Sequence, residues 1–587
     1  MHLVERKYDE AAFAALRAAG VKPLFARLLA ARGIGVANLE TYLAPAFRNL
    51  VPGDGLPGIS EAAATILDAL AAGRRIAVFG DYDCDGLCAT AIMTRALRSV
   101  AAGLRHGEGD ARQIVPFVPL RLGEGYGLGN ASLARLFREA PDVSLIVTVD
   151  NGITASPQIE ALNARGVEVV VTDHHLPGAE LPPAQVVVNP KVAAPEALSE
   201  LCGAAVAYFL ANAIVRLARS RCNDEMIARG IGAPLFILAG LATVTDIMPL
   251  TLQNRILVAE ALRHFHHWAP IGLRELYSRA ARNAGELGVR DFGFALGPRI
   301  NAAGRLASGM EALNLLMCSE DDRETARDLA MRVDIYNTER RVVEQRMCDA
   351  AMSLVIPGAS AQVISFSSED KENVHPGVAG VVASRILDRL ENPVPVCVLV
   401  DGKGSLRAPA PYNVRAALDA ASTHLAAYGG HALAAGVTVK PGEIEAFRAA
   451  FADACAAQRS SMSLAEVGAK TIDFELKPSD LTLAFAEEIS RLEPFGEGNP
   501  EPLFVLRSLV FSKNGVRTLG HTGAHLQFTF QQHAVPRAVW WGKGGEIERL
   551  RAESNLPHDI LFSVGISDYG GRHVELVISD IFVSPES

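Results

Sequence analysis

The sequence lacks the features of a membrane or secreted protein. Its 587 residues contain no uncharged apolar stretch of about 18 residues, the length that crosses a bilayer. The segment from Met1 to Glu10 carries too many charges for the apolar core of a signal peptide. The cysteines are scattered and form no Cys-x-x-Cys pair, so buried thiols are expected rather than disulfides. We therefore expect a cytoplasmic protein with no membrane partner.

Two further absences narrow the function. The chain has no Gly-x-Ser-x-Gly motif, so nothing supports hydrolysis by a Ser/His/Asp triad. It also lacks an excess of basic residues, because its formal net charge is −10. That charge argues against a protein that coats nucleic acid nonspecifically, but it leaves room for a nuclease whose basic residues line a groove.

The length predicts several domains, since one hydrophobic core does not serve so long a chain. An apolar stripe on a long helix, whose charged residues are expected on a solvated face, is formed by Leu329, Val333, Tyr336, Val343 and Met347. We interpret this helix as a connector between two lobes. Residues 297–306, rich in Gly, Pro and Asn, are expected to form a loop. The predicted parts are an N-terminal helical segment (1–55), a first α/β domain (56–318), the connector helix (319–352), a second α/β domain (353–462) and a small β-barrel (463–587).

Acidic residues and histidines recur where hydrophobic runs end. The runs at 75–79, 145–149 and 167–171 indicate parallel strands of an α/β sheet, whose carboxyl ends meet at one edge. Several carboxylates cannot share one small site while ionised unless cations neutralise them. The sequence therefore predicts a divalent metal site with two ions. The residues concerned are Asp81, Asp83, Asp85, Asp150, Asp173, His174, His175 and Asp246.

An EF-hand loop is the alternative for residues 81–86, which also begin Asp-x-Asp-x-Asp-Gly. An EF-hand requires a glutamate at the twelfth position, and Ile92 stands there. The first motif therefore belongs with the other strand ends.

The order of the motifs resembles the DHH phosphoesterase superfamily. Residues 81–86, 149–152, 173–175 and 245–249 are similar to its successive motifs. Residues 297–306, 375–378, 429–431 and 494–500 resemble, more narrowly, the RecJ family of single-strand-specific 5′→3′ exonucleases. The resemblance covers nearly the whole chain. It implies an α/β fold with a DHH lobe and a DHHA1 lobe joined by a long helix, followed by an OB-like β-barrel.

The resemblance also implies roles at the metal site. Asp150 would bridge two Mn²⁺ or Mg²⁺ ions, and Asp83 would hold one of them. Asp85, His174 and Asp246 would complete the other ion, and Asp81 would act directly or through water. Asp173 would orient a neighbouring histidine, and His175 would face the scissile phosphate. The sequence departs from the family at Phe79, where many members have histidine.

Further residues resemble groups that handle the nucleic-acid strand. Arg121 and Tyr126 suit phosphate contact and base stacking, although a surface loop with a packed tyrosine is the alternative. Ser405 and Arg407 resemble a pocket for a terminal 5′-phosphate, with Leu406 where a glycine is common. The remaining candidates either contact substrate or satisfy their own surroundings, and they are Arg299, Asn301, Arg305, His375 and His431.

The function implied is a metal-dependent exodeoxyribonuclease that releases 5′-mononucleotides from single-stranded DNA in recombination and repair. The implied partners are single-strand-binding protein and a RecQ-type helicase. One alternative is a DHH phosphoesterase for short oligonucleotides or cyclic dinucleotides, but such a substrate needs neither the connector helix nor the barrel. The other is an inactive DNA-binding relative, which the intact set of metal ligands disfavours.

Overall fold

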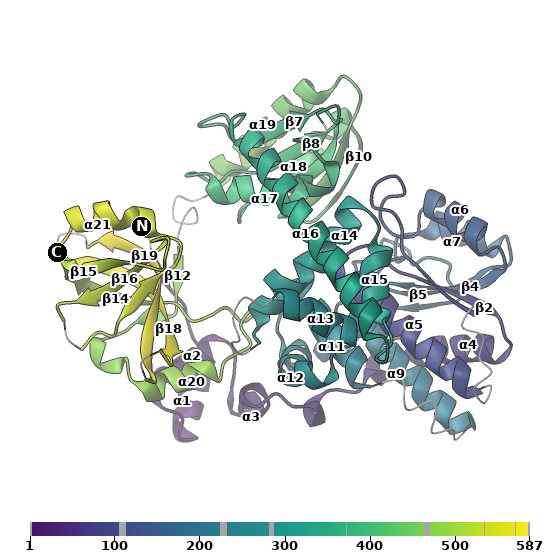
Figure 1. The fold of residues 1–587 in the computed structure, drawn as a ribbon, viewed down its shortest axis with the longest axis horizontal. Coiled ribbons are helices and arrows are strands. Elements are labelled where there is room, and N and C mark those ends of the chain that lie inside the picture. The colour runs from purple at the N-terminus through teal and green to yellow at the C-terminus, as the bar shows by residue number, and fades with distance from the viewer. Residues whose placement is uncertain are drawn as a thin grey trace. The chain divides into compact units, whose positions relative to one another are not determined.

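The computed structural model describes residues 3–104, 113–222, 232–280, 287–370, 373–462, 470–532, 534–569 and 571–584. Its contacts divide the chain into two compact units. The first unit comprises Met1–Leu50, Pro249–Ala259 and Gly468–Ser587, and the second comprises Val51–Met248 and Glu260–Val467. Figure 1 traces the elements of both units along the chain.

A parallel sheet of five strands forms the first half of the larger unit, in the order β3-β2-β4-β5-β6. Helices pack on it, and its strand residues are almost all buried, as a sheet covered on both faces requires. The strands are β2 (Arg75–Phe79), β3 (Ile114–Phe117), β4 (Val143–Val149), β5 (Glu168–Thr172) and β6 (Val186–Val188). The helices include α4 (Ile59–Ala71), α5 (Cys84–Leu104), α6 (Asn130–Glu139), α7 (Ser156–Asn163), α9 (Gly203–Cys222) and α11 (Ala233–Thr245).

Helix α5 is long and apolar enough to cross a membrane by length and composition alone. In the fold, 72% of that apolar window is buried, and the helix packs against α9 and α11. We interpret α5 as the core helix of this half.

The second half of the larger unit is a mixed sheet in the order β10-β11-β9-β8-β7. Strands β7 (Gln362–Phe366) and β8 (Val396–Val400) confirm the two strands expected in this region. The other elements are β9 (Lys403–Arg407), β10 (Leu425–Gly430), β11 (Ala434–Val439), α17 (Ala379–Arg389), α18 (Val414–Ala420) and α19 (Ile444–Ser461).

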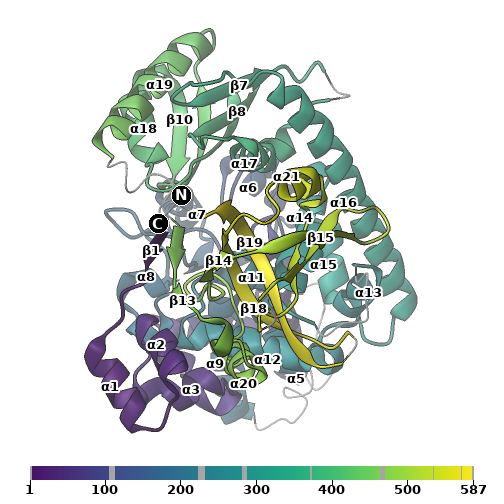
Figure 2. The same ribbon diagram turned by 90° about the vertical axis from the view of Figure 1, so that its left-hand side faces the viewer.

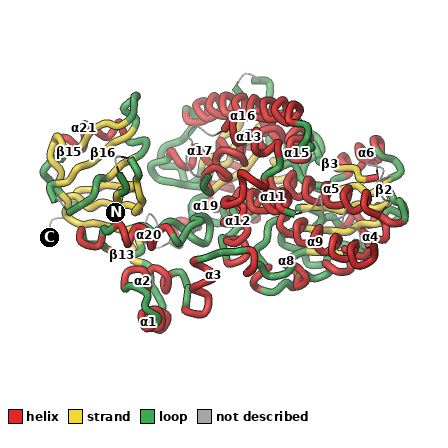
Figure 3. The backbone as a smooth tube through the Cα atoms, turned by 60° about the horizontal axis from the view of Figure 1, so that its bottom comes forward, coloured by secondary structure: helices red, strands yellow, loops and turns green. Residues whose placement is uncertain are grey.

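The expected connector helix is α16 (Arg323–Met352), whose first turn is capped by the carboxylate of Asp322. It packs against α13 (Ile271–Ala280), α14 (Gly297–Leu306) and α15 (Gly309–Met317) of the first half, and against α17 of the second. The red coil of α16 beside these helices is visible in Figure 3. Leu329, Val333 and Met347 of the predicted stripe are buried.

The prediction of a loop at residues 297–306 is wrong, because this segment is helix α14. Pro298 lies in its first turn, where a missing N–H costs little. Its small residues permit close packing, since a Cβ at Gly304 would lie 2.6 Å from the carbonyl oxygen of Tyr82. Glycine and proline therefore mark a tightly packed helix here.

The smaller unit combines the two ends of the chain. Its seven-stranded sheet, seen in yellow in Figure 2, shares one hydrophobic core with the N-terminal helices. Strand β1 (Leu3–Glu5) pairs with β12 (Lys470–Ile472). The helices are α1 (Glu10–Ala18), α2 (Pro23–Ala31), α3 (Leu39–Leu43), α20 (Leu483–Ser490) and α21 (Ile547–Ala552). The strands are β13 (Phe474–Glu475), β14 (Phe504–Leu509), β15 (Phe511–Leu519), β16 (His525–Phe530), β17 (Ala538–Trp540), β18 (His558–Ser567) and β19 (His573–Val583).

A fully buried arginine ties a third segment into this unit. Arg255 lies near the start of α12 (Leu252–Trp268), and its guanidinium stacks on the ring of Tyr42. It donates hydrogen bonds to the carbonyl oxygens of Tyr42 and of the turn at 491–494. A charge so deeply buried persists only where its donors are satisfied. Arg255 thus holds residues from three distant parts of the sequence together.

We expect Arg255→Met to lower the free energy of unfolding of the smaller unit by about 3 kcal/mol or more, because several buried carbonyls lose their donor. Chemical denaturation followed by circular dichroism measures this change. The matched control is Arg549→Met in α21 of the same unit, whose exposed ion pair with Glu546 contributes little. Equal stability of the two variants would contradict the assigned role of Arg255.

Candidate metal centre

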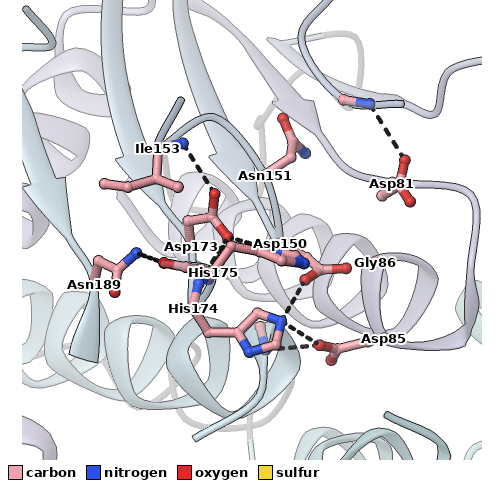
Figure 4. A network of polar contacts seen from close by, with 12 residues as sticks. Asp81, Asp85, Gly86, Asp150, Asn151, Ile153, Asp173, His174, His175 and Asn189 are labelled. Atoms are coloured by element: carbon pink, nitrogen blue, oxygen red, sulfur yellow. Dashed lines mark hydrogen bonds and ion pairs between the residues drawn. The ribbon is translucent and has the colours of Figure 1, made fainter. Parts of the chain in front are cut away.

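The strands of the parallel sheet deliver polar side chains to one edge. Asp81 follows β2, Asp150 follows β4, Asp173 follows β5 and Asn189 follows β6. Figure 4 shows Asp85, Asp150 and Asp173 close to His174 and His175, with Asp81 further away. The prediction that acidic strand ends meet at one edge is confirmed for Asp81, Asp150 and Asp173, whereas Asp246 ends helix α11 and not a strand.

His174 lies at the centre of the group. Its Nε2 atom is 3.1 Å from Oδ1 of Asp150, and 3.6 Å from a carboxylate oxygen of both Asp85 and Asp246. Asp85, His174 and Asp246 offer ligand atoms within 4.8 Å of one another, and so do Asp150, His174 and His175. Four segments of the chain therefore converge on two overlapping sets of metal-ligating groups.

The N-terminus of α9 fixes Asp85. The backbone N–H groups of Gly203 and Ala204 donate to its two carboxylate oxygens at 2.7 and 2.8 Å. These donors suit an anion at a helix N-terminus. A Cβ at residue 203 would lie 2.6 Å from the Cβ of Asp150, so only glycine allows this approach. No sequence motif marks Gly203, because its importance depends on contacts between distant segments.

Asp173 is held by hydrogen bonds on both of its oxygens. Oδ2 accepts the N–H of Ile153 at 2.9 Å, and Oδ1 accepts the N–H of His174 at 2.7 Å. Oδ1 also lies 2.7 Å from Nδ1 of His175. Burial lowers the pKa of His175, but the hydrogen bond and charge of Asp173 outweigh burial and raise that pKa to about 9. The geometry thus orients His175 and favours its protonated form.

Tyr126 reaches the centre from the loop after β3. Its hydroxyl donates to the carbonyl oxygen of Asp150 at 3.0 Å and lies 3.2 Å from Nδ1 of His175. Asp150 has a positive φ of 64°, a strained conformation for an aspartate outside a turn. The Tyr126 hydrogen bond supports that conformation, and half of the Tyr126 side chain remains exposed.

The charges of the centre call for cations. Burial raises the pKa of Asp81, Asp150 and Asp246 well above the usual carboxyl range, and neighbouring aspartates raise it further. Oδ1 of Asp150 is buried and accepts no hydrogen bond. Oxygen-rich ligand sets with few nitrogens suit Mn²⁺ and Mg²⁺. The residues present therefore fit divalent metal ions.

The middle of helix α14 supports the first acidic loop. Oδ1 of Asn301 accepts the N–H of Cys84 at 2.7 Å, which fixes the start of α5 between Asp83 and Asp85. Gly304 packs against the backbone of Tyr82 in the same loop. Asn301 thus contacts the acidic loop of residues 81–86, and its role is not confined to its own helix.

A group of arginines lies between the centre and the second half of the unit. Nη1 of Arg305 donates to the carbonyl oxygen of Gly377 at 3.1 Å. Burial and the charges of Arg121, Arg340 and Arg407 lower the pKa of Arg305 to about 10. Arg340 is paired with Glu344, so Arg121, Arg305 and Arg407 are the guanidinium groups left for an anion in this region.

Ser405 and Arg407 point to the same side of β9. A Cβ at Gly380, in the first turn of α17, would lie 3.3 Å from both Oγ of Ser405 and Nη2 of Arg407. Leu406, between them, points the other way into the hydrophobic core. Because side chains alternate along a strand, the leucine does not obstruct this site.

The other predicted residues have partners of their own. Arg299 pairs with Asp334 of α16 at 2.8 Å, and His375 caps a short helix by accepting the N–H of Gly377. His431 is exposed in the turn between β10 and β11. Phe79 packs against Phe117 in the core, so that position adds no metal ligand.

Comparisons with known proteins match this organisation. Residues 75–235 match the DHH family, N-terminal domain, residues 358–457 the DHHA1 domain, and residues 472–580 the RecJ OB domain. The single-stranded-DNA-specific exonuclease RecJ of Dickeya dadantii is 36% identical over 497 residues, which cover 82% of this chain and 83% of that protein. The Escherichia coli protein of the same name is 34% identical over 506 residues, with 83% of each chain covered.

Comparison with solved structures supports the same domain organisation. The structure of RecJ in complex with Mn²⁺ from Thermus thermophilus has a TM-score of 0.79 and 32% identity, covering 100% of this chain and 79% of that one. The corresponding complex with Mg²⁺ has a TM-score of 0.74 and 30% identity, covering 100% and 78%. The α/β fold with two lobes, a long connecting helix and a C-terminal OB domain is thereby confirmed.

We expect Mn²⁺ to raise the unfolding temperature of the protein, because it neutralises buried carboxylates that repel one another. In Asp150→Asn this increase should largely disappear, while the metal-free variant should be at least as stable as the metal-free wild type. Differential scanning calorimetry with and without Mn²⁺ measures both effects. A full Mn²⁺-dependent increase in the variant would contradict a metal centre built on Asp150.

Proposed function

This chain belongs to the RecJ family, and on that premise we propose that it is a single-strand-specific 5′→3′ exodeoxyribonuclease releasing 5′-mononucleotides. The observation that carries the proposal is the convergence of Asp85, Asp150, His174 and Asp246 within reach of shared metal ions. An inactive relative has no need to retain that arrangement.

We assign Asp150 as the residue shared by two ions, with Asp81 and Asp83 on one side of it and Asp85, His174 and Asp246 on the other. When bound, the ions supply an activated water and neutralise charge on the scissile phosphate. The chain itself positions these groups. The α9 N-terminus holds Asp85, and Tyr126 holds the backbone of Asp150. His175, oriented by Asp173, would donate a hydrogen bond to a phosphate oxygen.

We propose that the strand enters with its 5′-phosphate at Ser405 and Arg407. The first turn of α17 lies against both residues, so the Ser405 hydroxyl and the Arg407 guanidinium are close enough to bind one anion. Arg121 and Arg305 lie between this site and the metal centre, where they would contact the intervening phosphate. The 5′-phosphate site would thereby set the polarity of digestion.

The OB domain would bind the strand further from the reacting end. Trp540 is buried in its core, but Trp541 is 52% exposed, with His525 against its edge. An exposed aromatic on an OB domain suits base stacking. We further propose single-strand-binding protein and a RecQ-type helicase as partners, because the substrate must be unwound first. A cytoplasmic location follows from the DNA substrate, and the cysteines whose side chains the structure describes are all free thiols.

Substrate length distinguishes the proposed exonuclease from the alternative, a phosphoesterase for dinucleotides. The proposed enzyme should digest a long 5′-phosphorylated strand much faster than a cyclic dinucleotide, since most of its proposed binding surface lies outside the metal centre.

Asp150→Ala should reduce hydrolysis of single-stranded DNA by at least about a thousandfold, the scale of lost transition-state stabilisation. Strand binding should largely persist, because the arginines and the OB domain supply it. A nuclease assay and fluorescence anisotropy measure the two properties. The control is Asp142→Ala, an exposed aspartate just before β4, which should retain full activity. Substantial residual turnover in Asp150→Ala would rule out the bridging assignment.

Arg407→Ala should weaken the preference for 5′-phosphorylated over 5′-hydroxyl strands by roughly ten- to a hundredfold, since a charge-assisted contact contributes about 1.5–3 kcal/mol. Affinity for Mn²⁺ should stay unchanged. Competition between labelled strands of the two kinds gives the preference directly.

The matched control is Arg415→Ala, an exposed arginine of α18 that stacks on Tyr428 in the same lobe. An unaltered preference in Arg407→Ala would move the phosphate site elsewhere, with Arg121 as the next residue to test. Digestion from the 3′ end would overturn the proposed polarity.

A further inference from the structure

Two large apolar side chains stand exposed beside the metal centre. Ile247, the residue after Asp246, is 70% exposed, and Phe294 is 78% exposed. Phe292 and Leu296 on either side of Phe294 are buried, so Phe294 alone points outward from this segment. Single exposed apolar residues are common on proteins, but these two lie on segments that pack together beside Asp246, so they are candidates for a contact surface.

Ile247 occupies a position that normally belongs to glycine. The N–H of Met248 donates to the carbonyl oxygen of Thr243, and the N–H of Ile247 to that of Val244. These bonds close helix α11 in a Schellman motif, in which the residue after the C-cap takes a left-handed conformation. Ile247 has a φ of 55°, which is unfavourable for a β-branched residue. The chain thus tolerates local strain to keep an apolar side chain beside Asp246.

Phe294 lies in a segment packed against the same helix end. Residues Asp291–Leu296 form a π-helical turn that contacts α11. A Cβ at Gly293 would lie 3.5 Å from Val244, and one at Gly297 would lie 2.4 Å from Thr245. The exposed phenylalanine is therefore held next to the turn that carries Asp246 and Ile247.

Helix α14 orders the sites along one line. Its last turn contacts the second lobe through Arg305 and Gly377, three residues from Gly380 at the Ser405 and Arg407 site. Its middle contacts the acidic loop of residues 81–86 through Asn301. Its first residue packs on Thr245. The helix rises roughly 12 Å from Gly297 to Arg305. Ile247 and Phe294, near its first residue, therefore lie on the side of the metal centre away from the proposed 5′-phosphate site.

We propose that Phe294 and Ile247 form an apolar step that contacts the bases immediately 3′ of the scissile phosphate. This inference rests on the proposed function, because the direction of the strand comes from the 5′-phosphate site. A phenyl ring stacks on a base whatever its identity, and the isoleucine packs against the same unpaired nucleotides. Bases in a duplex are already stacked and paired, so the step would favour single strands.

The test compares Phe294→Ala with the wild type on a long 5′-phosphorylated strand and on the same strand with abasic residues at the first positions 3′ of the scissile phosphate. For the strand with all its bases, kcat/KM for the first cleavage should fall roughly tenfold or more, mainly through KM. For the abasic strand, which offers the step no base to contact, it should change little. Phe294→Tyr should restore the activity on the long strand. Leu354→Ala, which truncates another apolar side chain that is 51% exposed, is the matched control and should behave as the wild type.

Ile247→Gly separates a binding role from a structural one. Glycine is the preferred residue at this position, so the variant should unfold at a higher temperature than the wild type. Its KM for the long strand should nevertheless increase. A variant that is more stable and binds as tightly as the wild type would overturn the role of Ile247.

A spectroscopic measurement locates the contact. Strands with 2-aminopurine at successive positions 3′ of the scissile phosphate are bound to Asp150→Ala, which does not cleave them. Fluorescence should be quenched at one downstream position, and adding Phe294→Ala should abolish that quenching. Quenching that persists, or equal losses of kcat/KM on both substrates, would overturn the apolar step. Absence of hydrolysis by the wild type with Mn²⁺ would instead refute the proposed function, and the quenching would still test the step.

Discussion

The mutual repulsion of buried carboxylates is the constraint around which this half of the molecule is built. Asp81, Asp83, Asp150 and Asp246 lie near one sheet edge, where burial disfavours their ionised forms, and the carboxylate of Asp85 lies beside them. The fold opposes this repulsion with backbone donors. Helix α9 directs two N–H groups at Asp85. The loop after β5 directs two at Asp173, and Ile153, which follows β4, directs a third. What remains unsatisfied, such as Oδ1 of Asp150, is left for cations. The centre is thus incomplete as protein alone.

Helix α14 relates the metal centre to the rest of the unit. One side of it contacts the acidic loop through Asn301, and its ends contact the α11 turn and the second lobe. Helix α16 reinforces the arrangement through a buried carboxylate. Glu344 forms ion pairs with Arg340 of its own helix and with Arg385 of α17. Breaking such a pair leaves an uncompensated buried charge. The position of the second lobe against the first, and hence of the arginines between them, therefore depends on polar contacts as much as on apolar packing.

The sequence predicted the parts of the site that are local in the chain. The strands before Asp150 and before Asp173-His174-His175 can be predicted because an apolar run stops at a carboxylate. The connector helix can be predicted because its apolar residues recur at helical spacing. Gly203, Tyr126 and Glu344 were beyond the same reasoning about the centre or its support. Gly203 matters because it approaches Asp150, and Tyr126 because its hydroxyl reaches the Asp150 carbonyl oxygen. Glu344 was expected on a solvated face of α16, yet it is fully buried. In each case the deciding contact joins residues far apart in sequence. The helix at 297–306 was missed for a related reason, since its glycines serve close packing against Tyr82 rather than a turn.

Two departures from the family pattern have different consequences, and strand geometry explains why. Leu406 and Phe79 are both strand residues, and both side chains lie in hydrophobic cores. In β9, Ser405 and Arg407 lie on either side of Leu406. Because side chains alternate between the two faces of a strand, both residues lie on the face opposite Leu406, and their site stays intact. In β2, Phe79 occupies the position at which many members of the family have a histidine. A core phenylalanine therefore stands there in place of a nitrogen donor. In the proposed assignment, an ion beside Asp81 and Asp83 would then depend more heavily on carboxylate oxygens. Fewer nitrogen ligands would favour a harder cation such as Mg²⁺, and they would make Asp150 correspondingly more important for holding that ion.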